Sequence, residues 1–135
     1  MFKHILVPIS FDEDRDTNQS IDIAKHLVDD ATKITILHVM ERVPPYATTY
    51  MPEGYIENSR AGLKTELEAM AKTLPNCSAD VVSGHPGATI LDYAEKVECD
   101  LIILASHRPA MSDYLLGSTA HHVVRHAKCS VHVVR

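Results

Sequence analysis

Short apolar runs rich in branched side chains alternate along this chain with segments whose apolar residues recur at helical spacing. Such a run is typical of a strand buried on both faces, because both sides of its pleat must be covered. Alternation of strand and helix favours right-handed crossovers and a mostly parallel sheet with helices on both faces. The expected strands lie at 5–9, 34–39, 77–82, 100–104 and 130–134, and the expected helices lie near 21–28, 63–74, 90–97 and 117–127.

The length of 135 residues suits one domain that extends over residues 1–135. A domain of this size buries roughly two-thirds of the surface that its unfolded chain exposes. No linker, internal repeat or low-complexity segment interrupts the alternation. The segment from Arg42 to Gly54 is expected to be a loop that is long for a compact domain, and such loops are often lids or contact surfaces.

The charge balance and the cysteines exclude several classes of partner. The net charge is −5 and no Lys/Arg block is present, so nucleic acid is not expected as a partner. No apolar run approaches the roughly 20 residues of a membrane span, so no membrane association is expected. The three cysteines are far apart, and the first residues do not form a signal peptide. These features favour the cytoplasm with free thiols.

A small-residue turn and a helix start form the candidate ligand segment. In open parallel sheets, ligands bind at the carboxyl ends of strands, where the winding reverses. The fourth expected strand runs into Ala105-Ser106-His107-Arg108, and the fourth helix opens with Gly117-Ser118-Thr119. The free N–H groups and positive dipole end of a helix start favour an anion, and the hydroxyls of Ser118 and Thr119 add donors. The alternative is that Gly117 and Ser118 only cap the helix.

Four pieces of the chain together resemble the universal stress protein family, and in particular its short F-type branch. They are Ile5-Leu6-Val7-Pro8, His38-Val39, Gly84-x-Pro86 and, most specifically, the block from Ala105 to Arg135. The resemblance spans essentially the whole chain and is weakest between residues 40 and 58.

The resemblance implies a doubly wound α/β domain with a five-stranded parallel sheet in the order 3-2-1-4-5. It implies ATP, or the related ADP and AMP, as the ligand, and a homodimer joined through the last strand, with higher oligomers left open. Pro8 and Ile9 would form part of the wall of the site and contribute backbone groups to it. Val39 would contact adenine through its backbone. The expected nucleotide-binding residues are Pro8, Ile9, Ser10, Val39, Ala105, Ser106, His107, Arg108, Gly117, Ser118 and Thr119.

The phosphate loop departs from the family pattern. Nucleotide-binding members carry Gly-x2-Gly-x9-Gly-Ser/Thr, whereas Ala105 and Arg108 replace the first two glycines here and the spacer to Gly117 is one residue shorter. The altered loop is a mark of the F-type branch, so we interpret it as a variant phosphate loop. Arg108 can offer a bidentate donor to phosphate, or can be a solvated surface arginine. His107 can hydrogen-bond phosphate or ribose, or can be a surface or capping residue.

The end of the first expected strand also departs from the family pattern. Family members usually read Val-Pro-x-Asp, and this chain reads Val7-Pro8-Ile9-Ser10. A hydroxyl is a weaker magnesium ligand than a carboxylate, so Mg²⁺ is not favoured here. Nucleotide binding is less affected, because removal of an anion beside the phosphates also removes a repulsion. Asp12 could reach the site, or could belong with Asp14 and Asp16 to an acidic lead-in to the first helix.

The sequence contains no convincing nucleophile–base–acid set. His122 and His126 are four residues apart on one helix, which is a metal-compatible spacing, but we interpret them as part of a polar helix face. The expected function is a dimeric, ATP-binding stress-response or signalling module, and not an efficient enzyme. Two alternatives stay open: a nucleotide-free dimeric interaction module, and a weak ATPase or autophosphorylating protein with Ser118 or Thr119 as the phosphate acceptor.

Overall fold

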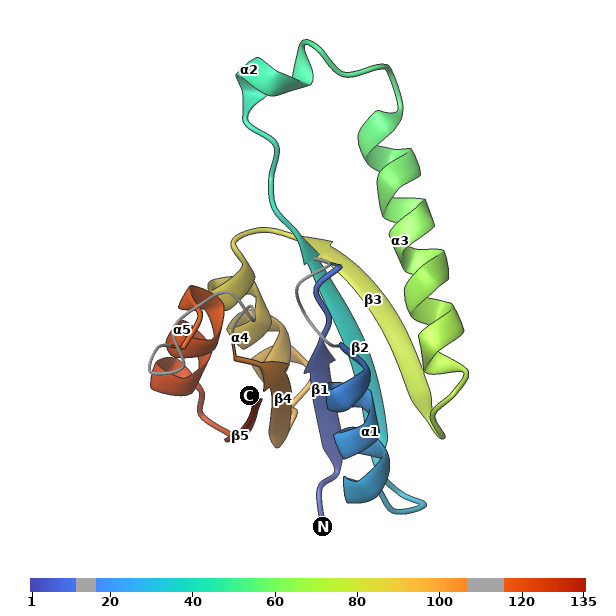
Figure 1. The fold of residues 1–135 in the computed structure, drawn as a ribbon, viewed down its shortest axis with the longest axis vertical. Coiled ribbons are helices and arrows are strands. Elements are labelled where there is room, and N and C mark those ends of the chain that lie inside the picture. Colours follow the sequence, from blue (N-terminus) through green and yellow to red (C-terminus); the bar gives the residue numbers. More distant parts are fainter. Residues whose placement is uncertain (12–16, 107–115) are drawn as a thin grey trace.

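The computed structural model describes residues 1–11, 17–106 and 116–135 (Figure 1). The predictions made for Asp12, Asp14, Asp16, His107 and Arg108 therefore lie outside the described residues.

Five parallel strands form one sheet in the order β3-β2-β1-β4-β5. The order confirms the predicted fold class. β1 lies at the centre, and the chain winds outward from it in one direction through β2 and β3, then in the other through β4 and β5 (Figure 1). The strands are β1 His4–Pro8, β2 Lys33–Met40, β3 Cys77–Ser83, β4 Leu101–Ala105 and β5 Ser130–Val134.

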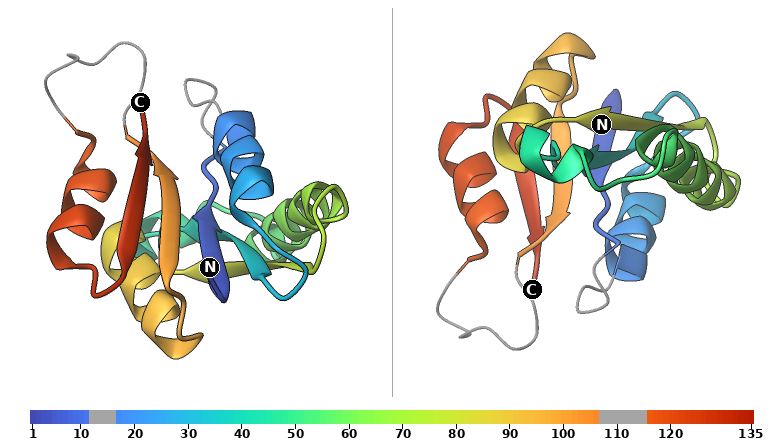
Figure 2. Two further views of the ribbon diagram at one scale, coloured as in Figure 1. Left: turned by 90° about the horizontal axis from the view of Figure 1, so that it is seen from below. Right: turned by 90° about the horizontal axis from the view of Figure 1, so that it is seen from above.

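Helices cover both faces of the sheet, as the views from below and above show (Figure 2). Helices α1 and α3 pack on one face, and α4 and α5 pack on the other. The helices are α1 Thr17–Leu27, α2 Pro45–Thr48, α3 Tyr55–Ala71, α4 Pro86–Lys96 and α5 Ser118–His126.

Alternate residues of β1 supply two separate cores. Ile5 and Val7 point into the layer of α1 and α3, whereas Leu6 points into the layer of α4 and α5, and none of the three side chains is exposed. A strand with both faces covered needs an unbroken apolar run, because its successive side chains point to opposite sides. Each such side chain stabilises the fold by roughly 1.5–3 kcal/mol relative to an exposed one.

The segment expected to be a loop contains one short helix. Pro45 is the first residue of α2, where a proline costs nothing because the first N–H of a helix has no partner. Figure 1 shows this segment rising beyond the carboxyl edge of the sheet before α3 returns along it. Tyr46 and Tyr50 are exposed on it, and α3 starts at Tyr55, earlier than its apolar pattern indicates.

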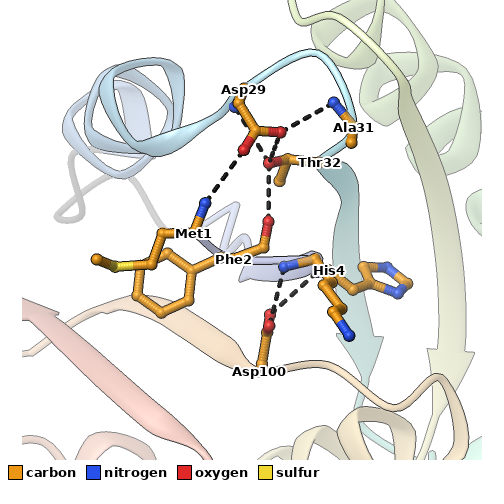
Figure 3. Close-up of polar contacts among 8 residues, drawn as sticks. Met1, Phe2, His4, Asp29, Ala31, Thr32 and Asp100 are labelled. Carbon is orange, nitrogen blue, oxygen red and sulfur yellow. Dashed lines mark hydrogen bonds and ion pairs between the residues drawn. The ribbon is translucent and has the colours of Figure 1, made fainter.

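Two carboxylates hold the start of β1 at the amino edge of the sheet (Figure 3). The carboxylate of Asp100 accepts hydrogen bonds from the amides of Lys3 at 2.9 Å and His4 at 3.0 Å. That of Asp29 accepts from the Met1 amino group at 3.1 Å and from the Ala31 amide at 2.9 Å. These contacts tie β1 to the start of β4 and to the turn before β2.

Both carboxylates are stabilised in their charged form. The hydrogen bond from the Met1 amino group is the largest cause that lowers the pKa of Asp29 to about 2. Burial alone would raise the pKa of Asp100, but the amide hydrogen bonds, from Lys3 first and then from His4, hold that pKa below its ordinary value. Each carboxylate therefore contributes stability in its ionised form.

Asp100→Ala should lower the free energy of unfolding by about 1 kcal/mol at neutral pH, because two charged hydrogen bonds are lost at a half-buried site near the surface. The folded-state pKa is depressed, so the contribution is present above the ordinary carboxyl pKa of about 4 and is lost as pH falls through the folded value. Urea unfolding across this range measures the difference. Asp30→Ala, at an exposed carboxylate before β2, is the matched control, and an equal effect of both variants would contradict the prediction.

Candidate functional site

A cavity of about 390 Å³ opens at the carboxyl edge of the sheet. It lies where the chain leaves β1 toward one side and β4 toward the other, which is the switch point at which sheets of this kind bind ligands. Its volume falls in the usual range of small-molecule pockets. Its lining residues are Pro8, Ile9, Ser10, Thr17, Ser20, Leu37, His38, Val39, Met40, Glu41, Pro86, Ile90, Leu104, Ala105, Ser118 and Thr119.

Seven of the predicted site residues surround this cavity. They come from the ends of three strands and from the first turn of α5. They are Pro8 at the end of β1, Ile9 and Ser10 just after it, Val39 on β2, Ala105 on β4, and Ser118 and Thr119 on α5.

Ser106 and Gly117 are adjacent to the cavity but do not line it. The amide of Gly117 donates to the carbonyl of Ser106 at 2.6 Å, and the amide of Ser106 donates to the carbonyl of Val134 at 2.8 Å. Ser106 is 2% exposed. These two residues therefore join the end of β4 to the start of α5, and they position the lining residues next to them.

The segment after β1 is held against β2 by a histidine. The amide of Ile9 donates to the carbonyl of Leu37 at 2.7 Å. The ring Nδ1 of His38 donates to the carbonyl of Ile9 at 2.8 Å, and the ring of Phe11 packs edge-on against His38 with centroids 4.8 Å apart. His38 thus makes a structural hydrogen bond to the segment after β1, and it also lines the cavity.

The start of α5 presents hydrogen-bond donors to the cavity. Gly117 is the N-cap in an extended conformation, and no side chain caps the helix there. The first amides of an α-helix have no acceptor within the helix, and its dipole places partial positive charge at this end. Ser118 is exposed and Thr119 half-buried, so both hydroxyls flank these amides at the cavity wall. The arrangement suits an anionic group of a ligand.

Several lining residues were not predicted. Glu41 follows directly on β2, which extends one residue further than its apolar run indicates. Thr17 and Ser20 lie on the first turns of α1, and their spacing of three places both on one helix face. A search for polar residues just after each expected strand would have found Glu41, because such residues gather at one edge of a parallel sheet.

The side chains around the cavity do not supply the oxygen ligands that a magnesium site of the protein's own would need. Glu41 is the one carboxylate among the described lining residues, and Ser10 contributes a hydroxyl. Within residues 1–11, 17–106 and 116–135, no three His, Cys, Asp or Glu side chains are grouped to hold a metal. Mg²⁺ is usually bound through carboxylates together with substrate phosphates.

Helices α4 and α5, which both contribute residues to the cavity lining, approach each other closely at Gly87. A Cβ atom on Gly87 would lie 2.8 Å from Cδ2 of His122, so only glycine fits the contact. The ring of His122 also packs on the ring of His126, with centroids 4.7 Å apart. His122 therefore packs between the helices, and the contact keeps Pro86 on α4 near the same cavity as Ser118 on α5.

A doubly wound parallel sheet with a polar cavity at its switch point defines a class of α/β protein whose architecture suits small ligands. The whole chain, residues 1–135, matches the model of the universal stress protein family, and the chain belongs to this family.

Curated relatives agree with this assignment. Universal stress protein A homolog 2 of Coxiella burnetii is 30% identical, over 99% of this chain and 95% of the relative. Universal stress protein G of Shigella flexneri is 27% identical over the full length of both chains. This chain and these relatives therefore match over nearly the whole length of each.

Solved structures share the fold. The structure of hypothetical protein MJ0577 is similar with a TM-score of 0.83 and 25% identity, covering 99% of this chain and 96% of that one. A universal stress protein in complex with cAMP is similar with a TM-score of 0.71 and 20% identity, over 99% and 97% of the two chains. One from Archaeoglobus fulgidus in complex with dAMP has a TM-score of 0.67 and 16% identity, over 97% and 96%.

Among the described residues, no helix combines the length and the apolar character needed to cross a bilayer.

Gly87→Ala should lower the free energy of unfolding by about 1–3 kcal/mol, because the new methyl group overlaps the ring of His122. Adding His122→Ala removes the overlapping ring and should restore part of this loss, as chemical denaturation of both variants would measure. Gly62→Ala is the matched control: its Cβ meets nothing within 4 Å, and it should stabilise α3 by about 0.5–1 kcal/mol. Strict additivity of the Gly87 and His122 substitutions would rule out the contact.

Proposed function

We propose that this universal stress protein binds an adenine nucleotide in the cavity at the carboxyl edge of its sheet. The observation that carries the proposal is the start of α5, where free amides and the hydroxyls of Ser118 and Thr119 face a cavity of about 390 Å³. The phosphates lie at this helix start. The adenine and ribose lie toward the ends of β1 and β2, against Ile9 and Val39.

Two related proteins support the choice of ligand. Their solved structures hold cAMP and dAMP, and both share the fold of this chain over nearly its whole length. Both ligands carry an adenine base and a phosphate group. A cavity with apolar walls from the strand ends and donors at one helix start is suited to that combination.

Binding is proposed to require no magnesium site of the protein's own. A hydroxyl from Ser10 stands at the end of β1, and the one carboxylate among the described lining residues comes from Glu41. Magnesium that accompanies ATP would then be held by the phosphates and water. The protein acts as a binding and signalling module, and the described lining residues include no paired nucleophile and base that would support rapid turnover.

Isothermal titration should show binding of AMP, ADP or ATP at sub-millimolar concentration, with similar affinity in magnesium and in EDTA. Ser118→Ala should weaken binding roughly 3- to 10-fold, because one hydrogen bond to a charged phosphate is lost. Thr65→Ala removes a hydroxyl that bonds the carbonyl of Ala61 on the exposed side of α3, and it should leave the affinity unchanged. An absence of heat with all three nucleotides would favour the nucleotide-free interaction module, and sustained ATP hydrolysis would favour the weak ATPase.

We propose further that two chains pair through β5. This strand lies at the edge of the five-stranded sheet, so one side of its backbone has no strand neighbour in the described part of the chain. Edge strands of this kind are templates for pairing with another chain. His132 is exposed at the middle of β5, and a twofold axis through the strand would bring it close to its own copy.

Analytical ultracentrifugation should give the mass of a dimer for the native protein. His132→Glu should weaken dimerisation about tenfold, because the same carboxylate enters both sides of a symmetric contact. His85→Glu, at an exposed histidine before α4, should leave the mass unchanged. A native protein that sediments as a monomer at micromolar concentration would refute pairing through β5.

A further inference from the structure

Two cysteine thiols lie side by side at the amino edge of the sheet. Cys99 precedes β4 and Cys129 precedes β5, and these neighbouring parallel strands pair with Leu101 opposite Ser130. The register therefore brings the two cysteines together although they are 30 residues apart in the sequence. Their sulfur atoms lie 3.9 Å apart, and both thiols are free.

We propose that Cys99 and Cys129 form a dithiol site that a hydroperoxide oxidises to a reversible intramolecular disulfide. A disulfide needs a sulfur–sulfur distance of about 2.05 Å, so the two atoms must approach by about 2 Å. Small rotations of the two side chains can provide this movement, because the strand pairing already holds the two backbones next to each other.

A second cavity gives the oxidant access to the pair. It has a volume of about 240 Å³ and lies between the ends of α4 and α5 that are remote from the nucleotide cavity. Both cysteines line it, together with apolar side chains from Leu91, Ala94 and Ile102. A hydroperoxide is small and uncharged, so it can enter an opening with such walls.

The surroundings of the two sulfurs assign them different roles. Cys129 is half-buried, whereas Cys99 is 9% exposed and directs its thiol toward the carbonyl of Leu101 at 3.7 Å. Burial is the largest cause that raises the pKa of Cys99 to about 12, and the neighbouring Cys129 raises it further. Because Cys129 is the more accessible of the two sulfurs, it attacks the peroxide, and the adjacent Cys99 resolves the product.

Hydrogen peroxide oxidises the pair in two steps. The Cys129 sulfur attacks one peroxide oxygen, the O–O bond breaks, and Cys129 becomes a sulfenic acid while one water leaves. The Cys99 sulfur then attacks the Cys129 sulfur, the S–O bond breaks, and a second water leaves as the S–S bond forms. Two thiols lose two electrons and two protons, and the peroxide gains them. A dithiol reductant reverses the change by thiol–disulfide exchange.

The third cysteine of the chain is a built-in control. Cys77 is the first residue of β3, and β3 and β5 are the two outermost strands, on opposite sides of the sheet. It is half-buried like Cys129, so its accessibility is comparable but it has no described thiol beside it. A reaction that depends on proximity will spare Cys77, and a reaction that depends only on exposure will not.

The experiment exposes the native full-length protein to hydrogen peroxide, blocks free thiols with N-ethylmaleimide after denaturation, and analyses intact mass and non-reduced peptides. The expected product has lost two hydrogens, carries a Cys99–Cys129 cross-link and one maleimide on Cys77, and reverts with dithiothreitol. Cys77→Ser should retain the cross-link, whereas Cys129→Ser should abolish it. Cys129→Ser serves as the negative control because its side chain is only half-buried and the substitution is nearly isosteric.

Four results would overturn the proposal: three alkylated thiols after treatment, a cross-link that includes Cys77, a disulfide between two chains, or a sulfinic acid on Cys129 with Cys99 still alkylated. None of these results depends on nucleotide binding, because the thiol pair and the nucleotide cavity lie at opposite edges of the sheet.

Discussion

The parallel pairing of β1 with β2 on one side and β4 on the other is the interaction on which the rest of the structure depends. Ile5 lies opposite Ile34 of β2 and opposite Leu101 of β4. Its neighbours Leu6 and Val7 are fully buried in the two separate cores. Because the chain departs from β1 and β4 in different directions, the connections at their carboxyl ends diverge, and a cavity opens between them.

The two edges of the sheet have different chemistry. At the amino edge, the carboxylates of Asp29 and Asp100 accept hydrogen bonds from backbone amides, and these hydrogen bonds fasten the start of β1. At the carboxyl edge, the amides and hydroxyls at the start of α5 face a cavity. The carboxylates that fasten β1 and the donors that face the cavity therefore lie at opposite edges, so substitutions at one edge can be tested with little effect on the other.

The contact between Gly87 and His122 connects packing to the proposed site. His122 and His126 attract attention in the sequence as a metal-compatible pair, but the ring of His122 fills the space above Gly87. The spacing of two histidines along a helix indicates that they share a face. Only the tertiary structure determines which element packs against that face. In this chain the covering element is α4, whose first residue, Pro86, lines the proposed nucleotide cavity.

Local patterns in the sequence were enough to determine the strands, the order of elements and most of the strand ends that surround the cavity. Apolar runs such as Ile5–Ile9 require burial on both faces, and this requirement alone indicates a covered parallel sheet. The helix that starts at Ser118 could be predicted equally well, because small and hydroxyl residues are typical of a helix start. Tertiary structure decided which of these residues face the ligand: Ser106 and Gly117 are turned to each other, while Glu41 and Ser20 reach the cavity. It also decided that Cys99 and Cys129 meet, because strand register brings together residues that no local pattern in the sequence connects.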